Sequence, residues 1–314
     1  MRARSTAILL ALAFSACATV AGPKPPSAKR VEHKEQWHGR EFVDPYFWLR
    51  EKENPEVRAY LAAENEYTEA MTADLASFRE TLYQEFVARV KQTDVDVPTK
   101  DGPFHYYSRT VEGLQYPIQA RKRAAADGSY DANAIEEVLL DANEMGKDLA
   151  YFGIGARALS DDHMQLAYST DVTGFRQYTL HVKDLASGAV RVDLAERVTS
   201  VEWAADGKTL FYVSEDAVTK RSNQLWRLEL GGSAELVFEE TDELFGLGLG
   251  RTRDGKYLMA GSGSTDTAEW RVLDAAQPRG EFTVVLPRAK GHRYELDHRD
   301  GYFYVVTDKG APNF

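Results

Sequence analysis

The stretch Val198-Thr199-Ser200-Val201-Glu202-Trp203-Ala204-Ala205-Asp206-Gly207-Lys208-Thr209-Leu210-Phe211-Tyr212-Val213 decides the fold. Its first part alternates apolar and polar side chains, as a half-buried β-strand does, and its last part is a second apolar run. Asp206-Gly207, between them, is typical of a tight turn, because Gly tolerates a positive φ and Asp can hydrogen-bond its own backbone. The stretch therefore predicts two antiparallel strands joined by a short turn.

This strand-turn-strand pattern recurs at a nearly constant period. Arg253-Asp254-Gly255 and Arg299-Asp300-Gly301 repeat the turn, Ser160-Asp161-Asp162 is a degenerate copy, and Lys100-Asp101-Gly102 is a weaker one. The central aspartates at 161, 206, 254 and 300 are 45, 48 and 46 residues apart. Such a period is typical of a β-propeller. A β-sandwich also has short strands and regular turns, but it gives no reason for the period.

Each period predicts a four-stranded blade, and the chain is expected to be dominated by β-structure. Residues 96–314 should form a partial propeller of four complete blades and half of a fifth. The expected strands are 104–110, 116–122, 136–141, 165–170, 178–184, 190–194, 198–203, 209–213, 224–230, 235–238, 257–261, 269–274, 282–286, 294–298 and 302–307.

The composition is that of a soluble globular protein, with 43% hydrophobic residues, 28% charged residues and a mean hydropathy of −0.45. The net charge of −11 argues against nucleic acid as a partner, because binding to phosphates needs clustered Lys and Arg. The excess of acidic groups is typical of a solvated surface. It could also steer cationic substrates towards the protein.

The first residues resemble a bacterial export signal. Arg2 and Arg4 precede a short apolar run at 7–14, and Phe14-Ser15-Ala16-Cys17 resembles a lipobox. Cys17 is the only cysteine, which excludes an internal disulfide and a cysteine-based metal site. We expect residues 1–17 to be a signal peptide and Cys17 to be the site of lipid attachment. The protein would then be exported, either as a periplasmic protein or as a membrane-anchored lipoprotein.

Residues 18–29 are rich in proline and should form an extended tether, although cleavage after Ala18 or Ala21 is an alternative to lipidation. Residues 30–95 should form a helical extension. Asn54-Pro55-Glu56 has the pattern of a helix start. A second helix is expected over 75–90, with an apolar stripe along one face, formed by Phe78, Leu82, Phe86 and Val90. The stripes of the two helices need a partner, either the outer wall of the propeller or a domain outside this chain.

The sequence offers no catalytic, cofactor or metal site. It contains no Gly-x-Ser-x-Gly, His-Glu-x-x-His or phosphate-binding loop. Gly246-Leu247-Gly248-Leu249-Gly250 is interpreted as a closely packed inner strand. The acidic run 239–243 is interpreted as a solvated loop between blades. His292 and His298 flank one strand without a third metal ligand nearby.

Several motifs resemble the prolyl oligopeptidase family of serine peptidases. Asp44-Pro45-Tyr46-Phe47-Trp48-Leu49-Arg50 and Asn54-Pro55-Glu56-Val57 are similar to the segment that enters the propeller of that family. Tyr106-Tyr107-Ser108-Arg109 resembles its first blade. Further along, Leu166-Ala167-Tyr168-Ser169 and Gly310-Ala311-Pro312-Asn313-Phe314 resemble the oligopeptidase B branch. The resemblance covers residues 30–314.

This resemblance implies a helical extension, a seven-bladed propeller and an α/β-hydrolase domain with a Ser, Asp and His triad. The propeller would exclude folded proteins and leave short peptides as substrates, cleaved after Arg or Lys in the oligopeptidase B branch. The chain would be the propeller portion of an exported serine oligopeptidase. We expect its hydrolase domain, which would be the partner of the helical extension, to lie beyond Phe314, so the chain alone should be inactive. The alternative is a lipid-anchored propeller that acts as a binding or scaffold module without catalysis.

Overall fold

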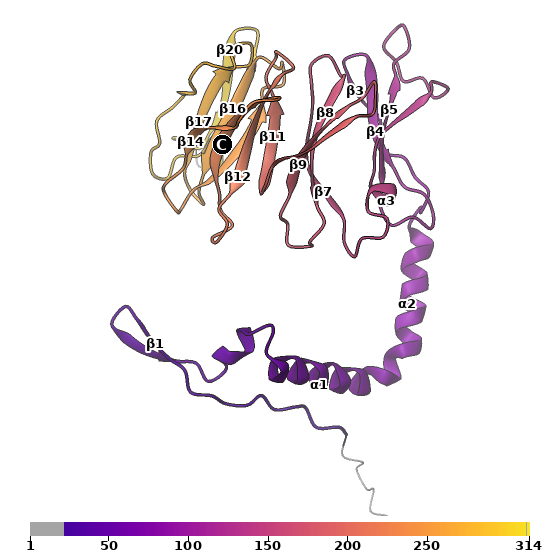
Figure 1. The fold of residues 1–314 in the computed structure, drawn as a ribbon, viewed down its shortest axis with the longest axis vertical. Helices are drawn as coiled ribbons and strands as arrows, with labels where there is room; N and C mark the ends of the chain where they lie inside the picture. The colour runs from indigo at the N-terminus through magenta and orange to yellow at the C-terminus, as the bar shows by residue number, and fades with distance from the viewer. Residues whose placement is uncertain (1–21, 312) are drawn as a thin grey trace, which may run out of the picture. The chain divides into compact units, whose positions relative to one another are not determined.

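The computed structural model describes residues 22–311 and 313–314 and separates into two compact units, Met1–Lys91 and Gln92–Phe314 (Figure 1). The first unit contains a hairpin and helices, whereas the second consists almost entirely of antiparallel sheets. The two units are described separately below.

The N-terminal unit contains both predicted helices. Its elements are β1 (Lys34–Trp37), β2 (Arg40–Val43), the 3-10 turn η1 (Phe47–Arg50), α1 (Pro55–Thr72), the 3-10 turn η2 (Ala73–Leu75) and α2 (Ala76–Arg89). The α1 helix begins where the sequence predicts, because the side chain of Asn54 accepts the N–H of Glu56 and Pro55 occupies the first turn. The observed α2 lies within the predicted range 75–90.

The second unit contains four sheets of four strands and one of two strands, which confirms the predicted blades. Blade 1 is β3-β4-β5-β6, blade 2 is β7-β8-β9-β10, blade 3 is β11-β12-β13-β14, blade 4 is β15-β16-β17-β18 and blade 5 is β19-β20. The strands are β3 (Thr99–Asp101), β4 (Phe104–Arg109), β5 (Ile118–Arg123), β6 (Glu136–Asp141), β7 (Gly153–Leu159), β8 (Gln165–Asp171), β9 (Thr179–Asp184), β10 (Val190–Ala195), β11 (Val198–Trp203), β12 (Thr209–Glu215), β13 (Ser222–Glu229), β14 (Glu235–Glu239), β15 (Gly246–Arg251), β16 (Tyr257–Gly263), β17 (Ala268–Asp274), β18 (Thr283–Val284), β19 (Tyr294–Arg299) and β20 (Tyr302–Thr307). One helical turn, α3 (Ala142–Met145), follows β6 and was not predicted.

In blade 2, the turn between the first two strands is centred one residue later than the sequence predicted. The structural counterpart of Asp206 and Asp254 is Asp162, rather than Asp161. Asp162 accepts the N–H of Met164, as Asp254 accepts the N–H of Lys256. His163 then takes the positive φ of 59° that Gly207 takes in blade 3. Because Asp161 and Asp162 are adjacent, the sequence did not indicate which of them occupies the turn position of Asp206.

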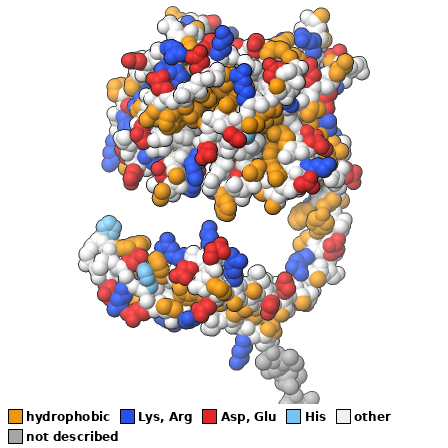
Figure 2. Space-filling model, in the orientation of Figure 1, with side chains coloured by type: hydrophobic (Ala, Val, Ile, Leu, Met, Phe, Trp, Pro, Cys, Tyr) orange, Lys and Arg blue, Asp and Glu red, His pale blue; other side chains and the backbone are white. Residues whose placement is uncertain are grey.

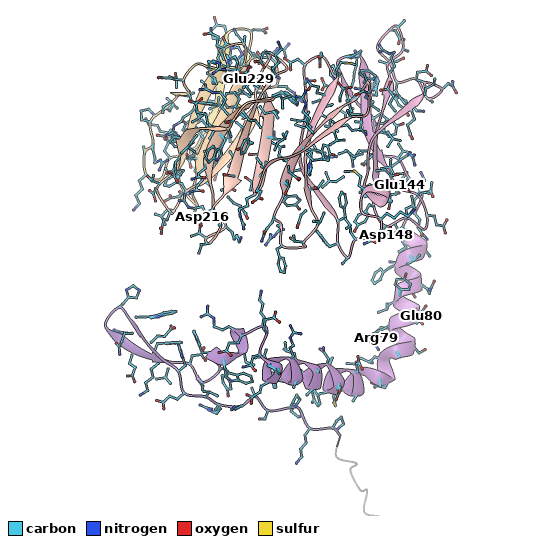
Figure 3. The ribbon with its side chains drawn as sticks, viewed as in Figure 1. Arg79, Glu80, Glu144, Asp148, Asp216 and Glu229 are labelled. Carbon is cyan, nitrogen blue, oxygen red and sulfur yellow. The ribbon has the colours of Figure 1, made fainter. Side chains whose placement is uncertain are left out.

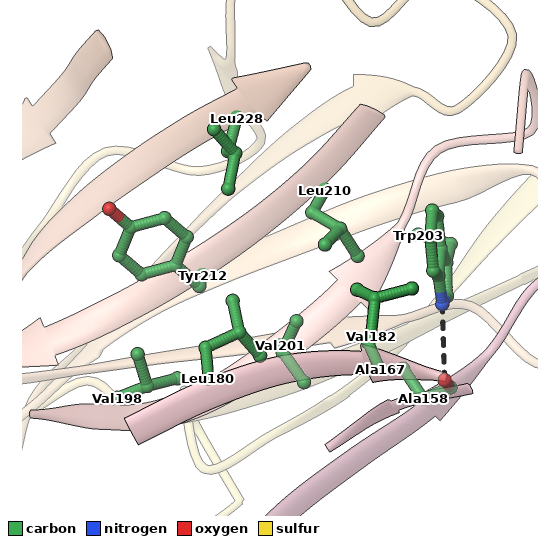
Figure 4. Close-up of a cluster of buried hydrophobic side chains, with 10 residues drawn as sticks. All are labelled: Ala158, Ala167, Leu180, Val182, Val198, Val201, Trp203, Leu210, Tyr212 and Leu228. Carbon is green, nitrogen blue, oxygen red and sulfur yellow. Dashed lines mark hydrogen bonds between the residues drawn. The ribbon is translucent and has the colours of Figure 1, made fainter. Parts of the chain in front are cut away.

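Neighbouring blades are held together by apolar side chains that face the seam between them. Between blades 2 and 3, the core includes Trp203, which is fully buried and donates its Nε1–H to the carbonyl oxygen of Ala158 at 3.1 Å (Figure 4). Between blades 3 and 4, Phe211 and Leu258 are fully buried in a second cluster. The alternation of the strands therefore serves packing between blades as well as within them.

The propeller has two ends, marked in Figure 3 by Glu229 and Asp216. The turns 161–164, 205–208 and 253–256 lie at the same end as Glu229, here called the turn end. The connection from β12 to β13, which contains Asp216, lies at the opposite end, here called the loop end. Between neighbouring blades, β7, β11 and β15 make the most extensive contacts, so the first strand of each blade is its innermost strand.

Candidate functional site

The predicted lipid site, Cys17, and the whole predicted signal peptide lie outside the described residues. Within residues 22–311 and 313–314, no helix is long and apolar enough to cross a membrane. Over the same described ranges, no group of three or more His, Cys, Asp or Glu side chains is arranged to hold a metal ion. The remaining candidates among the described residues are the inner strands, the seams between blades and the exposed surfaces.

The two histidines considered in the sequence lie in blade 5, each with a separate hydrogen-bond partner. The Nδ1 atom of His298 lies 2.6 Å from Oδ2 of Asp254 in blade 4, and Nε2 of His292 lies 2.8 Å from Oγ1 of Thr307. Burial alone would raise the pKa of Asp254, but hydrogen bonds from His298 and Thr252 outweigh it and lower the pKa to about 2. His298 thus links two blades through a charge-assisted contact.

The glycine-rich segment forms the innermost strand β15, as predicted, but the expected close packing is wrong. A Cβ atom added at Gly246, Gly248 or Gly250 would meet no atom within 4 Å. The apolar residues between them, Leu247 and Leu249, pack into the seam with blade 3 instead. The glycines therefore leave a smooth, open surface on the inner strand, which widens the space beside it.

An ion pair at the turn end joins two blades that are not neighbours. Arg251 of blade 4 donates Nη2–H to Oδ2 of Asp161 in blade 2 at 2.9 Å, and its Nε–H to the carbonyl oxygen of Gly255 at 2.7 Å. Its side chain is only 13% exposed. Beside it, burial raises the pKa of Glu202 in blade 3 to about 7, and the charge of Arg251 partly opposes this rise.

The acidic run 239–243 was predicted to be solvated, and Glu240 contradicts this. Glu240 is 3% exposed and forms an ion pair with Arg288, whose guanidinium also lies 3.7 Å from the ring centroid of Phe245. Glu269 accepts the backbone N–H of Arg288 at 2.9 Å. Burial would raise the pKa of Glu240, but the hydrogen bonds from Arg288, Ser262 and the backbone of Asp242, together with the charge of Arg288, outweigh it and lower the pKa. A partner 48 residues away along the chain could not be read from the acidic run.

The apolar stripe of α2 lies at the surface, where Figure 2 shows apolar side chains along the helix. Phe78, Phe86 and Val90 are 59%, 61% and 62% exposed. By contrast, Val57 in α1 is only 3% exposed. A contiguous apolar surface of this kind is typical of a region that contacts another protein surface.

Four-stranded antiparallel blades around contacting inner strands define a β-propeller domain, and the glycine-lined strand β15 is one of its open surfaces. Residues 25–314 match the family model described as "Prolyl oligopeptidase, N-terminal beta-propeller domain". The chain therefore belongs to the prolyl oligopeptidase family, as the sequence motifs predicted.

Two curated relatives are similar over nearly the whole chain. Dipeptidyl aminopeptidase BI of Pseudoxanthomonas mexicana is 40% identical over 99% of this chain and 44% of its own length. Protease 2 of Moraxella lacunata is 36% identical over 93% of this chain and 43% of its own length. The chain thus spans less than half the length of the curated relatives it matches.

Two solved structures have the same fold. Oligopeptidase B from Leishmania major superimposes with a TM-score of 0.80 at 28% identity, over 91% of this chain and 43% of that chain. Oligopeptidase B from Trypanosoma brucei, with covalently bound antipain, gives a TM-score of 0.77 at 29% identity, with the same coverage. These matches agree with the predicted propeller and helical extension.

Proposed function

We propose that this chain is the propeller portion of an exported serine oligopeptidase that hydrolyses short peptides after Arg or Lys. The observation that supports this most directly is the family match over residues 25–314. The names of the relatives, an aminopeptidase and a protease, are consistent with hydrolysis of peptide bonds. The basic residue at the cleaved bond is what the resemblance of the motifs to the oligopeptidase B branch implies, and two oligopeptidase B structures share the fold of this chain.

In this proposal the propeller controls access and the residues that cut the peptide lie outside the 314 residues. A serine would attack the scissile carbonyl, a histidine would act as its base, and an aspartate would orient the histidine. The sequence printed here contains no Gly-x-Ser-x-Gly elbow, and no residue in it is assigned such a role. The exposed stripe formed by Phe78 and Phe86 on α2 and by Val90 directly after it would bind the hydrolase domain.

The test compares four fluorogenic substrates of equal length, incubated with the complete enzyme and with the 314-residue chain. Two substrates carry Arg or Lys at the cleaved bond, one carries Pro and one carries Ala. We expect the complete enzyme to prefer Arg and Lys, with inhibition by a serine-directed phosphonate. The 314-residue chain should hydrolyse none of them. A complete enzyme that prefers Pro would overturn the proposed specificity, and phosphonate-sensitive hydrolysis by the chain would overturn the proposed division of roles.

One relative is named a dipeptidyl aminopeptidase, so a second experiment compares substrates with free and blocked N-termini. Each Arg substrate is tested with a free and with an acetylated N-terminus. An oligopeptidase should accept both, whereas removal of dipeptides requires the free amine. If no substrate is hydrolysed by the complete protein, the non-catalytic binding or scaffold module becomes the better explanation.

We also propose export, with lipid attachment at Cys17. The test is incorporation of labelled palmitate by cells expressing the chain, compared with Cys17→Ala and with Ser15→Ala as a matched control. Label in the wild type and Ser15→Ala, but not in Cys17→Ala, supports the anchor. Label that is absent from all three, with protein in the periplasm, would support export without an anchor.

A further inference from the structure

A cavity of about 520 Å³ lies between blades 1 and 2. Its floor is apolar, with Leu139, Leu140 and Leu166 all less than 10% exposed. Its remaining lining includes polar side chains, namely Asp96, Asp101, Ser108, Gln119 and Arg157. The volume falls in the range of about 300–1,000 Å³ that is typical of sites for small molecules, and an apolar floor with a few polar groups is their usual composition.

The two walls of this cavity are fastened to each other, so the space between them is part of the fold. Lys183 of blade 2 donates its Nζ–H to the carbonyl oxygen of Leu139 in blade 1 at 2.7 Å. At the turn end, Oη of Tyr106 lies 2.8 Å from Nδ1 of His163, and Arg121 donates to the carbonyl oxygen of His163 at 2.6 Å. Leu139 and Leu140 also form a buried apolar cluster with Leu166 and Tyr168 across the same seam, and the cavity lies beside this cluster.

Comparison of the blades shows that Arg157 is unusual at its position. Arg157 pairs with Tyr168 in the ladder of blade 2. The residues at the equivalent position of the first strand are Val201 in blade 3 and Leu249 in blade 4. Their ladder partners are Tyr212 and Ala260, respectively. Val201 is 3% exposed, and Leu249 packs against the core of its seam. Two seams are thus filled by an apolar side chain where the third has an arginine and a cavity.

The guanidinium of Arg157 is available to a ligand. Among the described residues it forms no ion pair and no hydrogen bond. An arginine side chain recognises a carboxylate with two parallel hydrogen bonds. The carboxylates of Asp96 and Asp101 in the same lining disfavour a second negative charge on the ligand.

We propose that the cavity between blades 1 and 2 binds a small monocarboxylate with a branched or aromatic apolar group. Arg157 pairs with the carboxylate, and the apolar group lies on Leu139, Leu140 and Leu166. Such a ligand has two sources, a free apolar acid or the C-terminal residue of a peptide. The amide of Gln119 offers hydrogen bonds to a peptide backbone, and the hydroxyl oxygen of Ser108, whose O–H donates to Asp96, can accept one. The site lies entirely within two blades, so binding does not depend on the proposed peptidase function.

The test is calorimetric titration of the full chain with three probes: acetyl-Ala-Leu, its C-terminal amide, and 4-methylpentanoate. We expect acetyl-Ala-Leu to bind at least about tenfold more tightly than its amide, because a charge-assisted pair is worth about 1.5–3 kcal/mol. If acetyl-Ala-Leu binds more tightly than 4-methylpentanoate, the ligand is the end of a peptide. If 4-methylpentanoate binds as tightly, it is a free acid.

Three variants make the result specific to the cavity. Arg157→Leu restores the residue type of the other seams and should abolish binding without lowering the Tm. Ala120→Leu keeps the arginine but fills the cavity, because Ala120 is a buried lining residue. Arg191→Leu, an exposed arginine on β10 outside the cavity, is the matched control and should bind like the wild type. Equal binding of acid and amide, unchanged binding by Arg157→Leu, or no binding of either carboxylate would overturn the proposal.

Discussion

Replacing Glu202 by Gln should stabilise the propeller at neutral and alkaline pH. Glu202 lies on the inner strand β11, next to the side chain of Arg251, and burial raises the pKa of its carboxyl from 4.5 to about 7. This rise in the pKa corresponds to about 3 kcal/mol of unfavourable free energy for the ionised form in the folded protein. Glutamine keeps the size of the side chain and removes the charge.

The pH dependence has a definite sign. Below about pH 4.5 the carboxyl is protonated in both the folded and the unfolded chain, so it imposes no cost. As the pH rises from 4.5 to about 7, the unfolded chain releases the proton first, and the free energy of unfolding falls. Above about pH 7 both states are ionised and the full cost of about 3 kcal/mol remains.

The assay is urea unfolding, followed by tryptophan fluorescence, at intervals from pH 4.5 to 8. The difference in free energy of unfolding between Glu202→Gln and the wild type should be near zero at the acidic limit and approach about 3 kcal/mol at pH 8. Glu295→Gln, an exposed glutamate on β19, is the matched control. A Glu202→Gln difference that is constant with pH, or that follows the control, would refute the reasoning.

Three further predictions follow from other contacts. Trp203→Phe should cost about 1–3 kcal/mol, because it removes the hydrogen bond to Ala158 and leaves part of the buried indole site unfilled, and Trp203→Ala should cost about 3–5 kcal/mol; urea unfolding measures both. Asp254→Asn should lower the Tm at pH 6 but not at about pH 2. The reason is that the stabilisation from the lowered pKa of Asp254 is present above pH 3.8 and is lost as the pH falls through about 2. A Tm difference that persists at pH 2 would contradict this prediction. Phe86→Ser should change the free energy of unfolding by less than about 0.5 kcal/mol and reduce the binding of a hydrophobic dye, whereas Val57→Ser, at a buried position, should destabilise the helical unit.

The blades could be predicted from sequence because their signals are local. Asp206-Gly207 specifies a turn by its own chemistry, and the apolar alternation on either side specifies the strands. The observed limits of β11 and β20 coincide with the predicted 198–203 and 302–307. The start of α1 could also be predicted, because Asn54 caps the helix and Pro55 occupies its first turn, and both signals are local in the sequence.

The contacts between blades could not be predicted, because they join residues far apart in the sequence. Glu240 looks solvated among its acidic neighbours until Arg288 is placed against it. Arg157 resembles any surface arginine, and only its alignment with Val201 and Leu249 identifies the position as unusual. Aligning the blades on the aspartate of each turn would have found that signal, had Asp162 been chosen over Asp161.

Some predictions about function remain untested. Cys17 lies outside the described residues, so export and lipid attachment stay predictions. The preference for Arg or Lys also stays a prediction, because no described residue has been tied to it, whereas family membership follows from motifs spread over the whole propeller. Fold and family were therefore accessible from sequence, and the substrate was not.

The pair between Arg251 and Asp161 has a mechanical consequence. The two residues belong to blades 4 and 2 and are 90 positions apart in the sequence, so the link encloses blade 3. Under a stretching force applied to the ends of the chain, blade 3 can detach only after this bond breaks or after a flanking blade unravels. During folding the same bond can close only once all three blades are in place. We therefore expect it to form late in folding and to hold blade 3 between its two flanking blades while they remain folded.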